Sequence, residues 1–80
     1  MREQTPHKSL DCTGLLCPMP VMKTNQAIRE LPVGQILELI ASDPGAMADI
    51  EAWASRTQHE LLMASKLDDG KVRLLIRKTH

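Results

Sequence analysis

The sequence predicts a two-layer α/β sandwich in which a mixed four-stranded sheet carries two helices on one face. Three observations support this prediction. Two segments have apolar residues at helical spacing, an apolar run lies between them, and the last quarter of the chain has the pattern of a hairpin. The predicted order is strand, helix, strand, helix, strand, strand (βαβαββ), and 80 residues leave room for a single domain over residues 1–80.

The first strand and the first helix are predicted from alternation and spacing. Residues 8–12 alternate weakly, which indicates a short strand after a polar tail over residues 1–7 that we expect to be flexible. Residues 18–31 have apolar side chains at helical spacing, and Pro32 and Gly34 end this pattern. We therefore expect the first helix over residues 18–31.

The second strand and the second helix meet at a turn that contains a proline. Residues 35–42 are rich in Ile and Leu, as is typical of a largely buried strand. Asp43 is expected to cap the next helix with its side chain, and Pro44 to take the first helical position, so that the helix covers residues 45–57. Its predicted buried stripe consists of Met47, Ile50, Trp53 and Ala54.

The end of the chain predicts a β-hairpin. Two runs with apolar residues, 60–67 and 71–78, are joined by the turn sequence Asp68-Asp69-Gly70. These two strands should pair antiparallel. The first two strands should be parallel because a right-handed crossover joins them through the first helix.

Composition argues against several classes of partner and location. Ten basic residues balance ten acidic ones without clustering along the chain, so we expect no direct binding of nucleic acid. The longest strongly apolar stretch, residues 36–41, is too short to span a membrane, and residues 1–7 lack the apolar segment of a secretory signal. We therefore expect a cytoplasmic protein whose two cysteines are free thiols.

The most informative segment runs from Asp11 to Pro20 and surrounds a cysteine. Gly14 allows a left-handed backbone between the first strand and the first helix, and Cys17 is the predicted N-cap of that helix. Pro18 and Pro20 then fix the first helical turn, where a missing N–H costs nothing. These residues predict a defined, solvent-reachable position for the Cys17 sulfur.

The predicted position of Cys17 indicates a reactive thiol. Free backbone N–H groups and the helix dipole favour thiolate over thiol, and Lys23 in the second turn adds a modest positive field if its side chain folds back. The alternative is a cysteine that serves only as a small buried hydrophobe. A docking surface for partners is expected around this thiol, formed by Leu16, Met19, Met22 and Lys23. An equally weighted alternative is that one of the two methionines lies in the core and the other is exposed.

Other candidate residues are expected to have structural roles. Cys12 is expected to pack in the core, although it could resolve a disulfide with Cys17. His7, His59 and His80 match no metal-ligand spacing, so we expect no metal site and no cofactor. His59 is expected to order a loop or lie at the surface, since no carboxylate partner is placed for it.

The sequence resembles the TusA (SirA-like) sulfur carriers. The residues that carry the resemblance are Leu10-Asp11, Gly14-Leu15, Cys17-Pro18-Met19-Pro20, Asp43-Pro44, Asp49-Ile50, His59-Glu60-Leu61 and Leu75-Ile76-Arg77-Lys78. The resemblance implies a βαβαββ sulfur-relay protein, a sulfurtransferase-type carrier rather than a stand-alone catalyst. Its Cys-Pro-x-Pro cysteine, here Cys17, would hold sulfane sulfur as a persulfide.

The resemblance also implies partners and pathways. The donor would be a cysteine desulfurase or a rhodanese, and the acceptor a DsrE-type protein. The sulfur would then serve tRNA thiolation, molybdenum-cofactor biosynthesis or cytoplasmic sulfur oxidation. Many members in the tRNA pathway have a basic residue directly before the cysteine and an acidic one between the prolines. This chain has Leu16 and Met19 there, which favours the sulfur-oxidation branch.

Two other functions remain open at this point. One is a regulatory or interaction module of the same fold in which Cys17 is dispensable. The other is a dithiol oxidoreductase that forms a reversible disulfide between Cys12 and Cys17.

Overall fold

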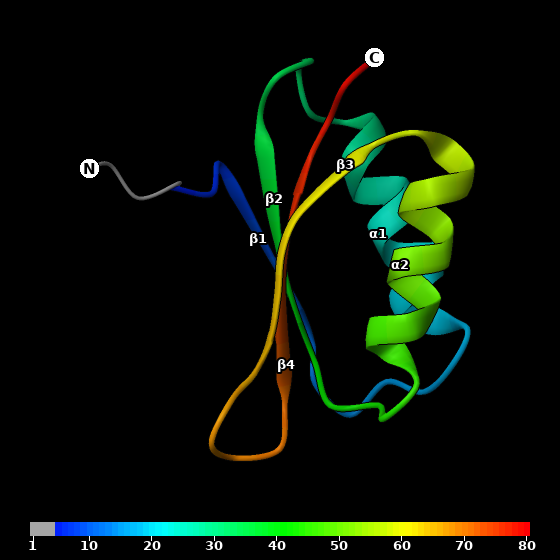
Figure 1. Cartoon of the computed structure of the whole chain (residues 1–80), viewed down its shortest axis with the longest axis vertical. Coiled ribbons are helices and arrows are strands. Elements are labelled where there is room, and N and C mark those ends of the chain that lie inside the picture. The colour runs from blue at the N-terminus through cyan, green and yellow to red at the C-terminus, as the bar shows by residue number, and fades with distance from the viewer. Residues whose placement is uncertain (1–4) are drawn as a thin grey trace.

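The structure is a computed structural model that describes residues 5–80 (Figure 1). Its elements follow the predicted βαβαββ order, and every boundary lies within two residues of the expected one. The elements are β1 (Lys8–Cys12), α1 (Met19–Arg29), β2 (Ile36–Ala41), α2 (Ala46–Thr57), β3 (Glu60–Lys66) and β4 (Val72–Arg77).

The four strands form one mixed sheet in the order β1-β2-β4-β3. β1 and β2 are parallel, with Leu10 opposite Leu39, and β4 runs antiparallel to both of its neighbours. The predicted pairings of the first two and the last two strands are confirmed. The last strand of the chain is a central strand, because it lies between β2 and β3.

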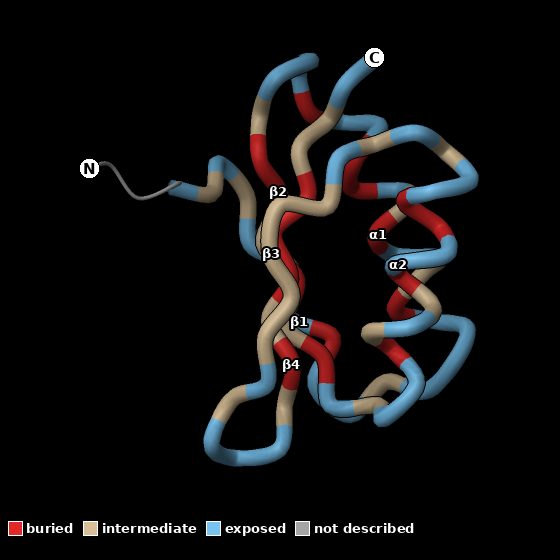
Figure 2. The backbone as a smooth tube through the Cα atoms, viewed as in Figure 1, coloured by how far each residue is buried: buried red, intermediate tan, exposed pale blue. Residues whose placement is uncertain are grey.

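Both helices cover the same face of the sheet, as predicted (Figure 1). The buried parts of the strands and helices face each other across the space between the two layers (Figure 2). Among the side chains exposed by 2% or less are Cys12, Ile28, Leu37, Leu39, Ile50, Trp53, Leu74 and Ile76. Of the stripe expected on α2, Ile50, Trp53 and Ala54 are buried, whereas Met47 is partly buried against the core.

The start of α2 differs from the prediction. Its N-cap is Gly45, and no side chain caps it. The backbone N–H of Ala46 donates to the carbonyl of Asp43 over 3.0 Å, which closes a turn that contains Pro44. The helix therefore begins after this turn, too late for Asp43 to cap it or for Pro44 to be its first residue. The Asp43 carboxylate is left free for another role.

His7, the last residue of the expected tail, contacts β2. The His7 backbone N–H donates to the Ile36 carbonyl over 2.8 Å, and His7 Nδ1 accepts from the Ile36 N–H over 3.0 Å. Residues 1–4 of the expected tail lie outside the described residues. His7 thus extends the contact between the first strand and β2.

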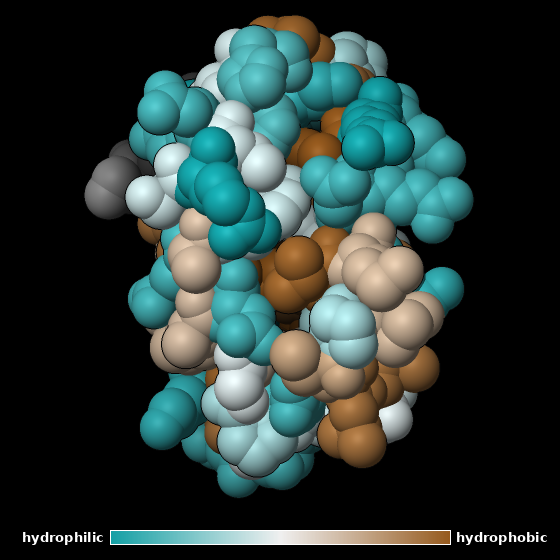
Figure 3. Space-filling view, turned by 90° about the vertical axis from the view of Figure 1, so that its right-hand side faces the viewer, coloured by the Kyte–Doolittle hydropathy of each residue, from teal (hydrophilic) through white to brown (hydrophobic). Residues whose placement is uncertain are grey.

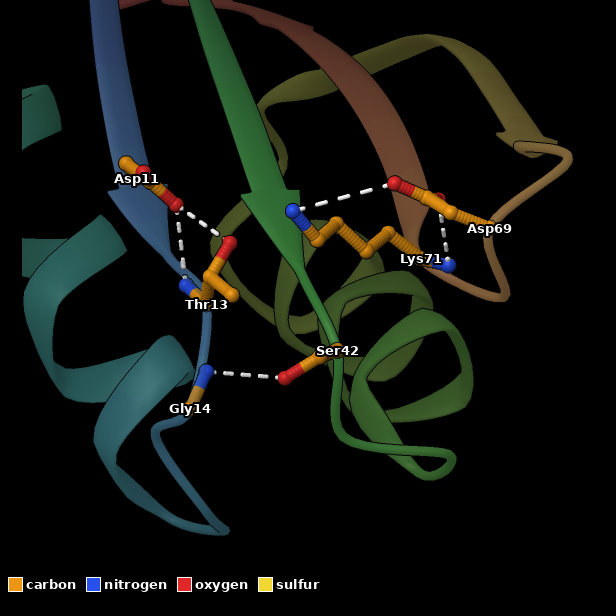
Figure 4. Close-up of polar contacts among 6 residues, drawn as sticks. All are labelled: Asp11, Thr13, Gly14, Ser42, Asp69 and Lys71. Carbon is orange, nitrogen blue, oxygen red and sulfur yellow. Dashed lines mark hydrogen bonds and ion pairs between the residues drawn. The ribbon is translucent and has the colours of Figure 1, made fainter.

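The hairpin between β3 and β4 has the predicted turn. Gly70 has a φ of +87°, and the Asp69 carboxylate accepts a hydrogen bond of 3.1 Å from the Lys71 N–H (Figure 4). β3 also contains a register shift between Leu61 and Met63, which the sequence did not reveal. Within residues 5–80, neither helix has the length and apolar character needed to cross a membrane.

The face of the sheet away from the helices carries an ionic network across three strands. Glu38 on β2 accepts hydrogen bonds from Ser9 on β1 over 2.6 Å and from Arg73 Nε on β4 over 2.5 Å. These bonds lower the pKa of the Glu38 carboxyl, with Ser9 as the largest cause and Arg73 next. Arg73 is thus held by Glu38 across the centre of this face.

Candidate functional site

Cys17 lies exposed in the loop between β1 and α1, one residue further from the helix than predicted. The Met19 N–H donates to the Leu16 carbonyl over 2.8 Å, so a hydrogen-bonded turn precedes the helix. Pro18 therefore takes the N-cap position that was expected for Cys17. Pro20 lies in the first helical turn, as predicted, and is buried.

The loop that carries Cys17 is fixed at its start by polar contacts (Figure 4). Asp11 Oδ1 accepts hydrogen bonds from the backbone and the hydroxyl of Thr13, over 3.0 and 2.6 Å, and these lower the pKa of Asp11. Gly14 adopts the predicted left-handed conformation with a φ of +84°, and its N–H donates to Ser42 Oγ over 2.8 Å. The loop after β1 is thereby tied to the end of β2.

Two carboxylates, from the loop before α2 and from α2 itself, raise the pKa of the Cys17 thiol. A hydrogen bond to Asp49 raises the pKa of Cys17, and the negative charge of Asp49, burial and the charge of Asp43 add to this effect. Asp43 and Asp49 flank Gly45, where an added Cβ would lie 3.7 Å from Oδ2 of each.

The predicted preference for thiolate at Cys17 is therefore wrong. Cys17 lies before the N-cap, not at it, so it is further from the free N–H groups of α1 than expected. The carboxylates of Asp43 and Asp49 oppose the helix dipole at this position. Asp43 and Asp49 thus favour the protonated thiol over the thiolate at Cys17.

Exposed apolar side chains adjoin Cys17 along the loop and the first turn of α1. Leu16 is 68% exposed, Met19 37% and Met22 57%, so both methionines lie at the surface. We name these three residues the thiol patch. Hydrophobic surface gathers at the lower right of the helix-bearing face, towards the end where α1 begins (Figure 3).

Lys23 was expected to act on Cys17, but it is not among the groups that shift the pKa of this thiol. It lines a shallow cleft between β1 and α1 together with Lys8 and Leu10. Its charge lowers the pKa of Cys12. Lys23 therefore lies beside β1 at this cleft.

Cys12 and the histidines lie apart from the thiol patch. Cys12 is fully buried in the core, and this burial raises the pKa of its thiol. A buried position agrees with packing and leaves Cys12 poorly placed to resolve a disulfide. His7 contacts β2, and His59 stacks on His80 beyond the end of α2. Within residues 5–80, no three His, Cys, Asp or Glu side chains are grouped to hold a metal ion.

Sequence reasoning missed Ser42, Asp43 and Asp49 as neighbours of the cysteine loop. Their proximity to this loop could have been inferred from the predicted topology, because β1 and β2 were expected to be parallel. The carboxyl ends of parallel neighbours lie at the same edge of a sheet, so the loops that follow them meet there. Asp49 lies in the first turn of the helix that starts from this edge.

Comparison with known proteins gives a consistent result. Residues 8–78 match the family described as Sulfurtransferase TusA. The chain is 40% identical over 72 residues to the sulfur carrier protein TusA of Allochromatium vinosum, covering 90% of this chain and 93% of that one. It is 51% identical over 53 residues to the putative sulfur carrier protein YrkF of Bacillus subtilis, which covers 66% of this chain but 29% of YrkF.

A solved structure shares the fold. The SirA-like protein of Desulfitobacterium hafniense superposes with a TM-score of 0.81, covering 91% of this chain and 99% of that one. The two sequences are 19% identical, so this likeness concerns the fold alone.

Proposed function

Since the chain belongs to the TusA family of sulfur carriers, we propose that it carries sulfur as a persulfide on Cys17 and passes it from a donor protein to an acceptor protein. The observation that supports this most directly is the position of Cys17. It is the exposed thiol of the chain, it lies in an ordered loop, and it adjoins an apolar surface on which a partner can dock.

The proposed chemistry consists of two thiol–persulfide exchanges. In the first, the Cys17 sulfur attacks the terminal sulfur of a donor persulfide. A new S–S bond forms at Cys17, the S–S bond of the donor breaks, and the donor leaves as a thiol. In the second, an acceptor thiol attacks the terminal sulfur on Cys17, which returns to the thiol form. No oxidant or reductant is consumed, because each exchange conserves one S–S bond and one thiol.

The first exchange requires Cys17 to lose its proton when it attacks. The Asp49 carboxylate acts on the pKa of this thiol more than any other group, so we propose that it takes that proton and passes it to the departing donor sulfur. Asp49 would thus hold the resting thiol protonated and also assist its deprotonation during transfer. The negative charge of Asp49 also disfavours the thiolate of Cys17 while no partner is bound.

The thiol patch is the proposed docking surface. Leu16, Met19 and Met22 are exposed although they are large and apolar, and they adjoin the sulfur that must reach a partner's cysteine. Methionine side chains adapt to differently shaped apolar surfaces, which suits a carrier that binds a donor and an acceptor in turn. Lys23 is not part of this proposal, because it faces the cleft beside β1.

We further propose the kind of partners and the setting. The donor is a cysteine desulfurase or a rhodanese, and the acceptor is a DsrE-type protein. The apolar residues Leu16 and Met19 favour delivery to sulfur oxidation over tRNA thiolation or molybdenum-cofactor synthesis. Both cysteines are free thiols, as expected in a reducing compartment such as the cytoplasm.

Intact-mass spectrometry tests the carrier proposal. After incubation with a cysteine desulfurase and cysteine, the chain should gain the mass of one sulfur atom, and a reductant should remove it. Cys17→Ser should gain nothing, whereas Cys12→Ala should load as the parent chain does because Cys12 is buried. Failure of the parent chain to gain sulfur from a desulfurase, a rhodanese or a small-molecule persulfide would refute the proposal and favour a cysteine-independent interaction module.

A matched pair of variants tests the docking surface. Met22→Glu and Val33→Glu each place one charge on a side chain that is more than half exposed, but Val33 lies beyond the opposite end of α1. Met22→Glu should slow loading from the donor protein by about tenfold, the effect of roughly 1.4 kcal/mol at an apolar interface. Val33→Glu should load normally, and a small-molecule persulfide should load both variants equally. Equal loading of both by the donor protein would rule out the thiol patch as the docking surface.

A further inference from the structure

A stack of three rings lies where α2, β3 and the last residues of the chain meet. Trp53 is 2% exposed, and its ring centroid is 5.6 Å from that of His59, which lies between α2 and β3. His80 stacks on His59, with centroids 4.6 Å apart and planes inclined by 8°. The last residue described thus lies flat against a histidine that packs on the chain's single tryptophan.

Hydrogen bonds hold the segment of Thr79 and His80 in this place. The Thr79 N–H donates to His59 Nδ1 over 3.3 Å, and the Thr79 hydroxyl donates to the Gln58 carbonyl over 2.7 Å. His80 Nε2 lies 2.8 Å from the Thr57 carbonyl and therefore carries a proton. We name residues 79–80, with these contacts, the clasp.

The contact at His59 Nδ1 depends on the protonation state of His59. This nitrogen accepts the Thr79 N–H, so it has a free lone pair and the ring is neutral, with its proton on Nε2. Once Nδ1 is protonated it becomes a donor that points at another donor, and the hydrogen bond is lost. The new charge would also face the stacked ring of His80 at 4.6 Å.

Within residues 5–80, none of the groups that shift the pKa of His59 carries a negative charge. From α2 the packed group is the neutral indole of Trp53, and from the end of β4 the groups that act on His59 are His80 and the cation of Lys78. Glu60, the next residue in β3, is engaged by Arg77. Burial, then His80 and Lys78, lower the pKa of His59.

From this geometry we propose that the clasp is a pH-sensitive device: residues 79–80 are held against α2 while His59 is neutral and are released when His59 takes up a proton. The folded pKa of His59 is below its ordinary value of 6.5, so the clasp is closed above pH 6.5 and opens as the pH falls through the folded value. Release exposes the carbonyls at the end of α2 and one face of the His59 ring. This inference is independent of the sulfur-carrier proposal, because the clasp and Cys17 are separate.

Nuclear magnetic resonance of the whole chain tests the clasp. As the pH is lowered below 6.5, the Thr79 amide resonance should shift and lose its protection from hydrogen exchange relative to an unstructured peptide. The fluorescence of Trp53 should change with the same midpoint. His59→Asn should abolish this transition while keeping Thr79 protected, because the Asn side-chain oxygen can accept the same hydrogen bond without titrating in this range.

Two further variants keep the test decisive. His7→Asn is the matched control, since His7 Nδ1 also accepts a backbone N–H, and it should leave the transition unchanged. His80→Ala removes the stack and should reduce the protection of Thr79 even at pH 8, so it gives an answer if His59→Asn does not fold. A Thr79 amide that stays protected at low pH, or a transition that persists in His59→Asn, would overturn the proposal.

Discussion

At Cys17, the side chains that raise the pKa of the thiol come from α2 and the loop before it, not from the helix that the cysteine precedes. Asp49 and Asp43 raise the pKa of the thiol, although the start of α1 alone would lower it. Carboxylates that approach from another element can therefore reverse what local sequence predicts for a cysteine.

Replacing Asp49 should reveal this effect directly. In Asp49→Asn the hydrogen-bonding shape is kept but the charge is lost, so the pKa of Cys17 should fall and more thiolate should be present at neutral pH. The measurement is the rate of alkylation of Cys17 by iodoacetamide as a function of pH, around the ordinary thiol value of 9.0. The midpoint should move to lower pH.

Glu51→Gln provides the control for that experiment. Glu51 is exposed on the same helix, and its replacement removes the same charge without touching the thiol. Its alkylation profile should match that of the parent chain. If the two variants behaved alike, the contact between Asp49 and Cys17 would not be what raises the pKa.

At the scale of the elements, one hydrogen bond connects the two helices through a buried ring. Trp53 Nε1 on α2 donates to Asn25 Oδ1 on α1 over 3.2 Å. Asn25→Ala should leave this N–H without its acceptor and lower the free energy of unfolding by about 1 to 2 kcal/mol. Urea unfolding followed by Trp53 fluorescence measures this change. Gln26→Ala, at an exposed neighbouring position, should change stability far less.

The elements themselves were predictable from the sequence, and the reason is visible in particular residues. Ile50, Trp53 and Ala54 on α2 recur at the helical period because one face of the helix is buried. Val72, Leu74 and Ile76 recur at the strand period for the same reason. A short turn such as Asp69-Gly70 depends on its own residues, so it too was predictable.

What the sequence did not predict depends on contacts between distant segments. The central position of β4 follows from its pairing with β2, which local pattern does not encode. The displacement of Cys17 from the N-cap is a local exception, because it depends on a turn closed by the Met19 N–H and the Leu16 carbonyl. The influence of Asp49 on Cys17 requires two loops to meet at one edge of the sheet. Of the candidate site, the sequence thus predicted the cysteine and its apolar neighbours but not its electrostatics.

At the scale of the whole molecule, the open face of the sheet should set the acid limit of stability. The folded pKa of Glu38 lies below its ordinary value of 4.5, so its bonds to Ser9 and Arg73 stabilise the fold above that pH and are lost as the pH falls through the folded value. Glu38→Gln should lower the free energy of unfolding by about 1 to 2 kcal/mol at neutral pH and by less in acid.

Thermal or urea unfolding over a series of pH values checks this expectation. Glu60→Gln is the matched control, because the ion pair between Glu60 and Arg77 lies at the exposed end of the hairpin. Exposed pairs contribute little, so this variant should follow the parent curve. A Glu38→Gln curve parallel to that of the parent chain would show that the network across β1, β2 and β4 does not account for the acid limit.

The carboxylates beside Cys17 also bear on oxidation. Peroxides attack thiolates, and successive oxidation leads from sulfenic to sulfinic and sulfonic acids that can no longer accept sulfur. Asp49 and Asp43 keep the exposed thiol protonated, while Cys12 is shielded by burial. In the proposed carrier, the two side chains that disfavour the Cys17 thiolate would also slow its oxidation by peroxide between transfers.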